Sequence, residues 1–282
     1  MGRYLFRAAA AAALAFPLAA QAQTIPADEP TVFDGDWLTV GIGAGYAPSY
    51  EGSDDYVVYP QPVIQGRLKG IDITARPGGA VLDFIPDAKG AKVGLALGPI
   101  ARLRANRDSN IQDRVVRRLG KLDKAVEVGV GAGVTIYDLA TGYDTLTFSS
   151  DVKWDVAGAH KGMTMSPRIS YFTPVSRGMA VGLSLDAEHV DDDYADYYFT
   201  VTPAGSAASG LPAFDADGGW KSAGVNLLVG VDFDGELANG GLAAFFTGGY
   251  SRLLGDAKRT PLTSIRGDAD QWMGSAGIAY TF

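Results

Sequence analysis

Apolar residues recur at every second position over much of this chain, and the alternation is clearest at its end. One side of the repeat runs from Trp272 through Ile278 and Tyr280 to Phe282, and the intervening residues are smaller and more polar. Successive side chains of a β-strand point to opposite faces of a sheet. The segment therefore predicts a strand with one apolar face and one polar face, closed by an aromatic residue.

The same period-two pattern recurs along the chain and divides it into many strands. Between Val126 and Ile136, for example, Val, Ala and Ile residues alternate with Glu, Gly and Thr residues. Marking every such segment predicts twelve strands, over residues 37–47, 56–68, 70–76, 79–85, 91–104, 124–137, 143–157, 162–172, 178–190, 218–233, 240–252 and 268–282. An even number of strands is typical of single-chain bacterial barrels and places both ends of the barrel-forming chain on the same side.

The connections between the predicted strands fall into a short set and a set that contains long loops. Outer-membrane barrels have short turns on the periplasmic side and longer loops outside. The short set is Lys69, Pro86–Gly90, Asp138–Gly142, Thr173–Arg177 and Asp234–Asn239, and the long loops are Ala105–Asp123, Asp191–Asp217 and Leu253–Gly267. In a soluble sandwich the apolar faces would pack against each other, whereas in a barrel they contact lipid and the polar faces line the lumen.

The start of the sequence has the features of an export signal. Arg3 and Arg7 precede an apolar run from Ala8 to Ala20, and Ala20-Gln21-Ala22 supplies a small-x-small cleavage pattern. The run is shorter than the roughly 20 residues that a membrane-spanning helix needs, and no later stretch is long and apolar enough. These features predict a signal peptide over residues 1–22, a short periplasmic segment over 23–36 and an all-β, transmembrane antiparallel β-barrel over 37–282, located in the cell outer membrane.

Composition narrows the possible functions. The net charge is −8, and removal of Arg3 and Arg7 with the signal makes it more negative still. This charge argues against a nucleic-acid partner, because phosphates need clustered Lys and Arg. The chain has no cysteine and only two histidines, which excludes disulfides and thiol chemistry and leaves little for a histidine-based metal site. We therefore expect no cofactor and no metal site.

Two glycine-rich segments and two acidic runs have alternative interpretations. The spacing in Gly41–Gly45 and Gly129–Gly133 is similar to a dinucleotide fingerprint, but that site needs a strand–turn–helix context. Here the glycines continue an alternating strand, which favours close packing inside the barrel. The acidic runs Asp191–Asp196 and Asp215–Gly218 lack the closing Glu of an EF-hand loop. A solvated acidic loop is therefore favoured over a cation site.

A lipid hydrolase would need a serine, a histidine and an acid brought together. His189 lies near the external end of a predicted strand, at a position that faces lipid, and it is followed by Val190 and Asp191, not by a nearby serine. His160 lies in the tight turn between two predicted strands. We expect no enzymatic activity and assign no catalytic residue.

Charged residues of both signs occupy inward-facing positions on three neighbouring predicted strands. The set consists of Asp151, Lys153, Asp155, Arg168, Asp186 and Glu188. Two interpretations remain open, a hydrated lumen wall and a functional cluster that plugs the lumen or lines a pore. Opposite charges on neighbouring strands attract strongly in a partly dehydrated interior. We hypothesise that Lys153 and Arg168 pair with these acids and keep the lumen mostly shut.

Several segments resemble the MipA/OmpV family of outer-membrane proteins. They are Pro48–Tyr56 with the following Pro60 and Pro62, Gly120–Gly133, Tyr250–Gly267 and Gln271–Phe282. The resemblance spans essentially the whole predicted mature chain and is most specific in its C-terminal part. The final strand, which ends on Tyr280 and Phe282, resembles the signal by which outer-membrane barrels are recognised for assembly.

The resemblance implies a barrel without known catalysis. The member that gives the family its name scaffolds a lytic transglycosylase with a peptidoglycan synthase, whereas other members are described as osmotically regulated porin-like or adhesive proteins. We expect a non-enzymatic scaffold for peptidoglycan-remodelling enzymes. A small-solute channel and an adhesin that presents its long external loops remain alternatives. The expected partners are outer-membrane lipid, the barrel-assembly machinery and those two enzymes.

Overall fold

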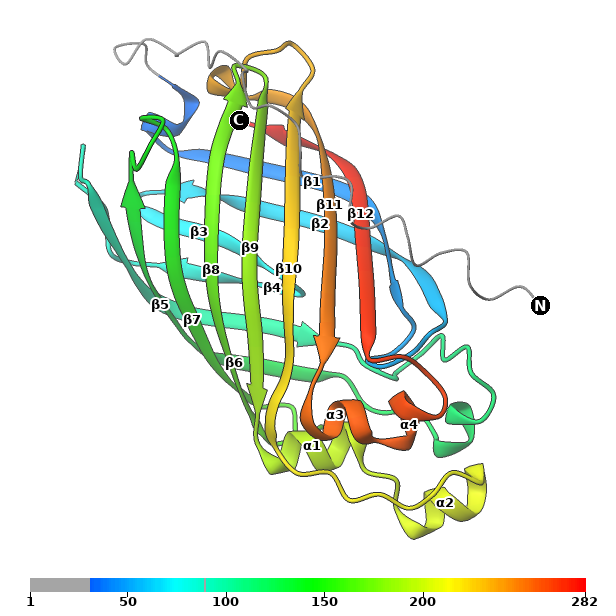
Figure 1. Ribbon diagram of the computed structural model, residues 1–282. Coiled ribbons are helices and arrows are strands. Elements are labelled where there is room, and N and C mark those ends of the chain that lie inside the picture. The colour runs from blue at the N-terminus through cyan, green and yellow to red at the C-terminus, as the bar shows by residue number, and fades with distance from the viewer. Residues whose placement is uncertain (1–30, 89) are drawn as a thin grey trace.

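Twelve antiparallel strands form a closed barrel in the computed structural model, which describes residues 31–88 and 90–282 (Figure 1). The strands are β1 (Trp37–Pro48), β2 (Tyr56–Leu68), β3 (Ile71–Arg76), β4 (Gly79–Asp83), β5 (Val93–Arg104), β6 (Ala125–Tyr137), β7 (Thr145–Asp155), β8 (Met163–Ser176), β9 (Met179–Val190), β10 (Gly219–Asp232), β11 (Gly241–Leu253) and β12 (Asp270–Thr281). Each strand pairs with its neighbours in sequence, and β12 pairs with β1 to close the barrel. The predicted strand number and order are confirmed. The predicted signal peptide lies outside the described residues.

The alternation that predicted the strands sets which side chains face outward. Val130 and Leu183, at predicted lipid-facing positions, are 49% and 47% exposed. The inward positions carry small or polar residues, and aromatic rings fill the space above some glycines. Gly45, for example, lies under the Tyr59 ring, and a methyl group there would collide with that ring. The period-two pattern therefore predicted both the strands and their two faces correctly.

The largest error in a predicted strand end is in the eighth strand, since the other predicted ends lie within two residues of the observed ones. The pattern ended the eighth strand at residue 172, whereas β8 continues through Pro174 to Ser176. The ladder between β8 and β9 shifts register between Pro174 and Ser176. Proline cannot donate a backbone hydrogen bond, so it is tolerated in a sheet at such an irregularity. The turn before β9 is correspondingly shorter than predicted.

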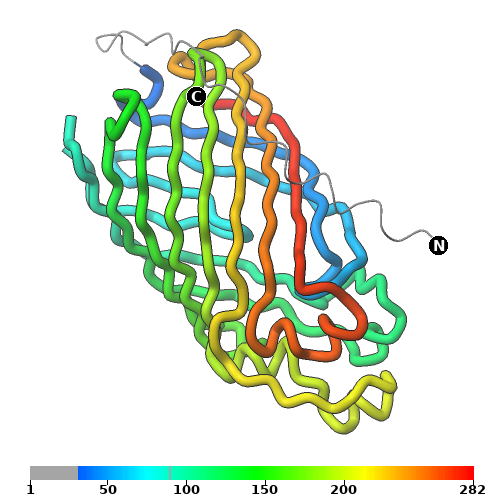
Figure 2. Tube along the Cα trace, viewed as in Figure 1, coloured from blue at the N-terminus to red at the C-terminus, as the bar shows by residue number. Residues whose placement is uncertain are grey.

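The two ends of the barrel differ. We call the end where β1 begins and β12 ends the turn end, and the opposite end the loop end. The loop end carries four short helices, which the sequence patterns did not predict: α1 (Asp192–Phe199), α2 (Pro203–Ser209), α3 (Gly255–Arg259) and α4 (Pro261–Ser264). All four lie within the predicted long loops and cover one end of the barrel (Figures 1 and 2). No helix among the described residues is long and apolar enough to cross a membrane.

The helices begin at residues suited to capping. Asp191 precedes α1, and its side chain accepts a hydrogen bond from the Tyr194 backbone N–H. Thr202 caps α2 in the same way through Gly205, with Pro203 at the first helical position. Both arrangements satisfy backbone donors that a helix N-terminus leaves unpaired. Asp191 thus belongs to a helix cap and not to a freely solvated acidic loop.

The long loops form a lid with its own apolar core. One cluster packs α1 against the ends of β9 and β11 through Val190, Tyr194, Ala195, Tyr198, Phe199, Ala216, Leu253 and Ala257. A second cluster joins Tyr50, Ile111, Val116, Val201, Leu211 and Leu262, which come from four different connections. Buried apolar contacts between several loops hold them in one arrangement. The lid is therefore a folded layer over the loop end.

Candidate functional site

Charged side chains from four strands and one loop meet beneath the lid. Arg104, the last residue of β5, lies at the centre of this group and binds three carboxylates. Its Nε lies 2.6 Å from Oε1 of Glu127, its Nη1 lies 3.0 Å from Oε1 of Glu51, and its Nη2 lies 2.7 Å from Oε1 of Glu188. We call the set Glu51, Arg102, Arg104, Glu127, His160, Glu188, Tyr194 and Lys221 the mouth cluster.

Two further cations complete the ion pairs. Lys221 Nζ lies 2.9 Å from Oε1 of Glu51 and also pairs with Glu188. Arg102 Nη1 lies 3.2 Å from Oε1 of Glu188. Lys221 lies at a register shift between β9 and β10, where the extra residue of a β-bulge re-aims a side chain. This irregularity brings a lysine inward next to the carboxylates.

Tyr194 connects the lid to the mouth cluster. Its hydroxyl oxygen accepts hydrogen bonds from Arg104 Nη1 at 2.8 Å and Lys221 Nζ at 3.3 Å, and it donates to Oε2 of Glu51 at 3.1 Å. The Arg104 guanidinium also lies 4.9 Å from the centre of the ring, a distance at which a cation is attracted to an aromatic face. Burial raises the pKa of the Tyr194 phenol well above its usual value. The phenol therefore stays neutral and can donate.

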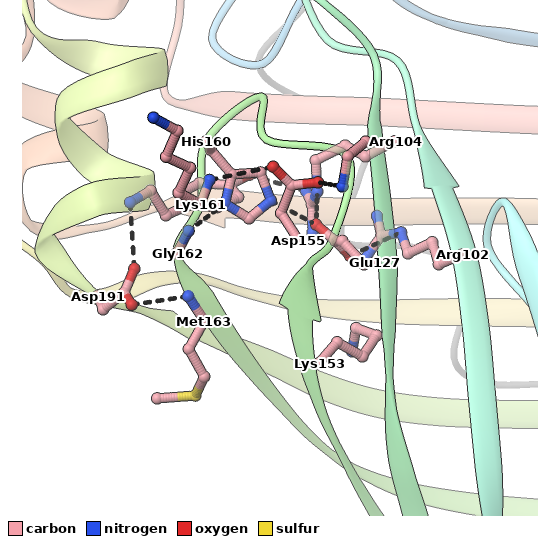
Figure 3. Close-up of polar contacts among 12 residues, drawn as sticks. Arg102, Arg104, Glu127, Lys153, Asp155, His160, Lys161, Gly162, Met163 and Asp191 are labelled. Carbon is pink, nitrogen blue, oxygen red and sulfur yellow. Dashed lines mark hydrogen bonds and ion pairs between the residues drawn. The ribbon is translucent and has the colours of Figure 1, made fainter.

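His160 enters the mouth cluster from the turn between β7 and β8 (Figure 3). Its Nδ1 accepts a hydrogen bond from the Gly162 backbone N–H at 3.1 Å, and its Nε2 lies 3.2 Å from Oε1 of Glu127. With Nδ1 acting as acceptor, the proton of a neutral ring is on Nε2, which donates to Glu127. His160 is therefore fixed on both sides of its ring.

Two aspartates hold this turn and α1 in place (Figure 3). Asp155 accepts hydrogen bonds from the backbone N–H groups of Ala157 and Lys161. Asp191 caps α1 and also accepts a hydrogen bond from the Met163 backbone N–H at 2.6 Å. Gly162 lies so close to the Asp191 carboxylate that a methyl group would overlap it. These contacts fix α1, and with it Tyr194, relative to the first residues of β8.

The mouth cluster is buried and electrically balanced. Three carboxylates face three cations, and Arg104, Glu127 and Lys221 are 3%, 0% and 5% exposed. Burial alone would raise the pKa of Glu51, but the Lys221 ammonium and the Arg104 guanidinium outweigh it and hold that pKa below its usual value. Buried charges are tolerated when they are paired in this way, and removal of one partner is costly. The cluster therefore lies buried beneath the lid, with each of its charged side chains in an ion pair.

The six predicted lumen charges lie in and below this cluster but mostly not as partners of each other. Asp151 pairs with Arg76 at 3.1 Å, Lys153 donates to Ser166 at 3.1 Å, and Asp186 accepts from Asn226 at 2.5 Å. Asp155 caps the turn described above, and Glu188 belongs to the mouth cluster. Arg168 lies directly opposite Asp186 in the ladder between β8 and β9. Among the described residues, however, Arg168 has no ion pair or hydrogen bond.

The cations that bind the acids are therefore ones that sequence reasoning missed. Arg76, Arg102 and Arg104 lie at inward positions of predicted strands, so the alternation alone could have placed them in the lumen. Glu51 and Tyr194 come from connections without a period, and Lys221 is brought inward by a bulge. No sequence pattern identifies these last three.

The structure also shows the contacts of the remaining candidate residues. Tyr280 and Phe282 are exposed on the outer surface at the turn end, with ring centres 4.6 Å apart, and their role in assembly stays a prediction. The His189 ring packs edge-on against Trp220 at 5.4 Å. Gly43 and Gly129 pack against the backbone of adjacent strands, as the packing interpretation predicted. Within the described ranges no group of three or more His, Cys, Asp or Glu residues could hold a metal ion.

Several solved structures of outer-membrane proteins are similar to the chain. It is similar to an outer-membrane channel from Pseudomonas putida F1, with 13% identity, a TM-score of 0.45, and 92% of this chain and 100% of that chain covered. It is also similar to the outer-membrane protein OprD from Pseudomonas aeruginosa, with 12% identity, a TM-score of 0.37, and 89% of this chain and 66% of that chain covered. A third similar structure is the Pseudomonas putida toluene transporter TodX, with 9% identity, a TM-score of 0.36, and 88% of this chain and 89% of that chain covered. These similarities concern the fold alone.

The family of the chain follows from its sequence. None of the curated proteins compared with the chain matches it. The model of the family described as MltA-interacting protein MipA matches residues 40–282, which include all of the barrel except the start of β1. The match agrees with the resemblance seen in the sequence and with the closed twelve-stranded barrel. The chain is therefore an outer-membrane β-barrel that belongs to the MltA-interacting protein MipA family.

Proposed function

We propose that this barrel is a non-enzymatic binding protein that scaffolds peptidoglycan-remodelling enzymes at the outer membrane. The observation that supports the proposal best is the mouth cluster, in which ion pairs centred on Arg104 lie buried beneath a folded lid, and we infer that they close the lumen. A channel needs a continuous open path, whereas a scaffold does not. A barrel that is closed by a balanced, fully paired set of charges is better suited to binding than to conduction.

The turn end offers a surface for such binding. Outer-membrane barrels face the periplasm with their short turns, and peptidoglycan lies on that side of the membrane. Two turn-end connections carry exposed apolar side chains: Leu139 is 52% and Phe233 is 62% exposed. Exposed apolar side chains are typical of protein-binding surfaces. We propose that these residues contact the enzyme.

The proposed partner is a lytic transglycosylase. The family is described as MltA-interacting protein MipA, and the family resemblance implies a lytic transglycosylase bound together with a peptidoglycan synthase. Catalysis by the barrel itself has no support, because both histidines have other contacts. His160 is held by Glu127 and Gly162, and His189 packs on Trp220.

A direct binding measurement tests the proposal. The purified barrel, in nanodiscs, is titrated with a purified lytic transglycosylase of the MltA type. The double variant Leu139→Ser, Phe233→Ser should weaken binding by tenfold or more, since loss of apolar contacts that are central to an interface costs roughly 2 kcal/mol or more. Ile265→Ser is the matched control, because this equally exposed residue lies at the loop end. No measurable binding by the wild-type barrel would overturn the proposal.

A small-solute channel is the second candidate, and one observation favours it. Below the mouth cluster, the inward-facing Thr247 and Met273 are exposed to the lumen, so the interior is not filled throughout. Single-channel recording of the wild type beside Lys153→Ala/Arg168→Ala separates the two functions. A closed barrel should conduct little, and the double variant should conduct more and favour cations, because lumen acids lose compensating charge. A large, steady wild-type conductance that the double variant leaves unchanged would favour the channel.

A further inference from the structure

The barrel wall is incomplete on one side. Strand β2 pairs with β1 along nearly its whole length, from Tyr56 to Arg67. With β3, in contrast, β2 pairs only through Gly66–Leu68. The edge of β2 from Tyr56 to Gln65 therefore has no strand partner, and no described backbone hydrogen bond covers it. At about 3.3 Å per residue, this free edge is roughly 30 Å long.

Two prolines keep that edge free. Pro60 lies opposite Ala44 and Pro62 lies opposite Ile42 in a ladder with β1 that continues without a register shift. In an antiparallel ladder the backbone groups of alternate residues point to opposite edges. Proline has no N–H to donate, so Pro60 and Pro62 fit this ladder with their nitrogens on the edge away from β1. An edge that lacks these donors is a poor template for a further strand, whether from β3 or from another protein.

The gap beside the free edge is bounded at both ends and does not run the full height of the barrel wall. At the loop end, the Glu51 backbone N–H donates to Oδ1 of Asn106 at 2.9 Å and bridges from the β1–β2 loop to the loop after β5. At the turn end, the short ladder of Gly66–Leu68 with β3 closes it. On the far side, the tip of the β3–β4 hairpin is fixed by the Leu103 N–H, which donates to the Gly78 carbonyl at 2.9 Å. We call the bounded gap between β2 and β3 the side opening.

The side opening lies at the level of the lipid hydrocarbon. The outward residues Val58 and Ile64 on β2 are 69% and 49% exposed, and apolar outward residues mark the part of a barrel that contacts lipid. Gln65 and Thr74, which have inward-facing positions on the two bordering strands, are also exposed. The side opening therefore lies between a lipid-facing border and exposed lumen residues, with no strand ladder between them along Tyr56–Gln65.

An arginine whose guanidinium makes no direct ion pair lies inside. Arg76, on the bordering strand β3, pairs with Asp151 across the lumen. Arg168 is attracted by Asp186, which lies opposite it in the ladder, and by Asp151, but among the described residues it makes no direct ion pair or hydrogen bond. The donors of a guanidinium in a partly dehydrated lumen that make no direct contact favour an anionic group such as a phosphate or carboxylate.

From this arrangement, we propose that the side opening admits the acyl chain of an anionic membrane amphiphile, whose head group binds Arg168 in the lumen. An acyl chain suits the apolar outer border, and a negative head group suits the donors of the Arg168 guanidinium, which make no direct contact. A protein strand does not suit the edge, because Pro60 and Pro62 cannot donate to it. The proposal goes beyond the scaffold function and does not depend on it.

Lipid access can be measured directly, because the chain has no cysteine. A fluorescent probe is attached to a single cysteine in the variants Gln65→Cys, Thr74→Cys, Ser184→Cys and Leu183→Cys, and each is reconstituted with brominated lipids. Leu183 faces lipid and Ser184 faces the lumen at a fully paired part of the wall. Probes at positions 65 and 74 should be quenched nearly as strongly as the probe at 183. Quenching at both positions as weak as that at 184 would overturn the side opening.

The head-group part of the proposal has its own test. With the probe at position 65, quenching by brominated phosphatidylglycerol is compared with quenching by brominated phosphatidylcholine. The wild-type background should prefer the anionic lipid, and Arg168→Gln should reduce this preference by roughly tenfold, as expected for a lost charge-assisted hydrogen bond. Arg252→Gln, at an exposed arginine near the loop end of β11, is the control and should keep it. Equal quenching by the two lipids in the wild type would overturn the role of Arg168.

Discussion

The hydroxyl oxygen of Tyr194 lies 2.8 Å from Nη1 of Arg104, although 90 residues separate the two in the sequence. Tyr194 belongs to a helix of the lid, and Arg104 is the last residue of a barrel strand. The contact therefore joins the lid to the wall at a point where three carboxylates also converge on the same guanidinium. Lid and mouth cluster should lose their structure together and not one after the other.

The Tyr194→Phe variant tests this coupling. It keeps the ring but removes a hydroxyl that contacts Arg104, Lys221 and Glu51, so buried polar groups lose partners at a cost of about 1–3 kcal/mol. Urea unfolding of the reconstituted barrel measures the change in free energy. Tyr197→Phe is the control, because its hydroxyl accepts only the Asp123 backbone N–H at a more exposed site. Equal losses in both variants would contradict the special position of Tyr194.

The lid should also weaken in acid. The pKa of Glu51 is held below its usual value by Lys221 and Arg104 against the effect of burial. Burial would likewise raise the pKa of Asp113, but hydrogen bonds from Arg266 and from the backbone N–H of Val116 outweigh it and hold that pKa below its usual value. A carboxyl with a lowered folded-state pKa stabilises the fold above its unfolded-state pKa, and this contribution is lost as pH falls through the folded-state value.

Hydrogen exchange over a pH series measures this effect. Protection of α1 and of residues 105–123 should stay constant from neutral pH to about pH 5 and then fall as the pH drops below the ordinary carboxyl range of about 4. Protection of mid-barrel strands such as β9 serves as the internal reference. A lid that keeps full protection at pH 3 would contradict the assigned ionic contacts.

The orientation of β9 predicts an asymmetry between adjacent positions. Leu183→Arg places a charge in the hydrocarbon and should destabilise the barrel by about 2–4 kcal/mol, whereas Ser184→Arg places it in the hydrated lumen. Both substitutions introduce the same residue one position apart in the same strand, so each controls for the other. Identical denaturant midpoints for the two variants would show that the inward and outward faces of β9 are reversed.

The terminal aromatic residues predict an effect on assembly rather than on stability. Phe282 is 67% exposed and contacts Tyr280 on the outer surface, so few buried contacts are lost when it is removed. Deletion of Phe282, or Phe282→Asp, should nevertheless sharply lower the amount of heat-modifiable, membrane-inserted barrel. Phe84→Ser, at an exposed phenylalanine beside Leu97 of β5, is the control. Normal amounts of the inserted Phe282 variant would disprove the assembly signal.

Sequence patterns predicted the barrel well because one physical rule, the alternation of faces, acts along every strand. Positions such as Val130 and Leu183 need no knowledge of distant residues to be placed on the lipid side. The lid escaped prediction because its helices are short and rest on contacts made after folding. Asp191 illustrates this, since the same acidic run that indicated a solvated loop caps α1 and binds the first residue of β8.

The partners in the lumen escaped prediction for a geometric reason. Sequence places Asp151 and Lys153 on one face of one strand, but it does not say which strand lies across the lumen from them. Arg76 reaches Asp151 from β3 across the interior, and such a contact depends on the width and curvature of the closed barrel. The inward position of Lys221 depends further on a β-bulge, which the period-two pattern does not reveal.

The isolated bridge between Ser53 and Gly267 joins the first connection of the barrel to the last one. Such a contact spans nearly the whole chain, so its loop-closure entropy is high and it should form late. Resistance of the lid to an external protease would then report that the final hairpin has already met the first. In living cells, an external protease should therefore digest the lid of barrels whose first and last hairpins have not yet met. The lid of fully closed barrels should stay intact.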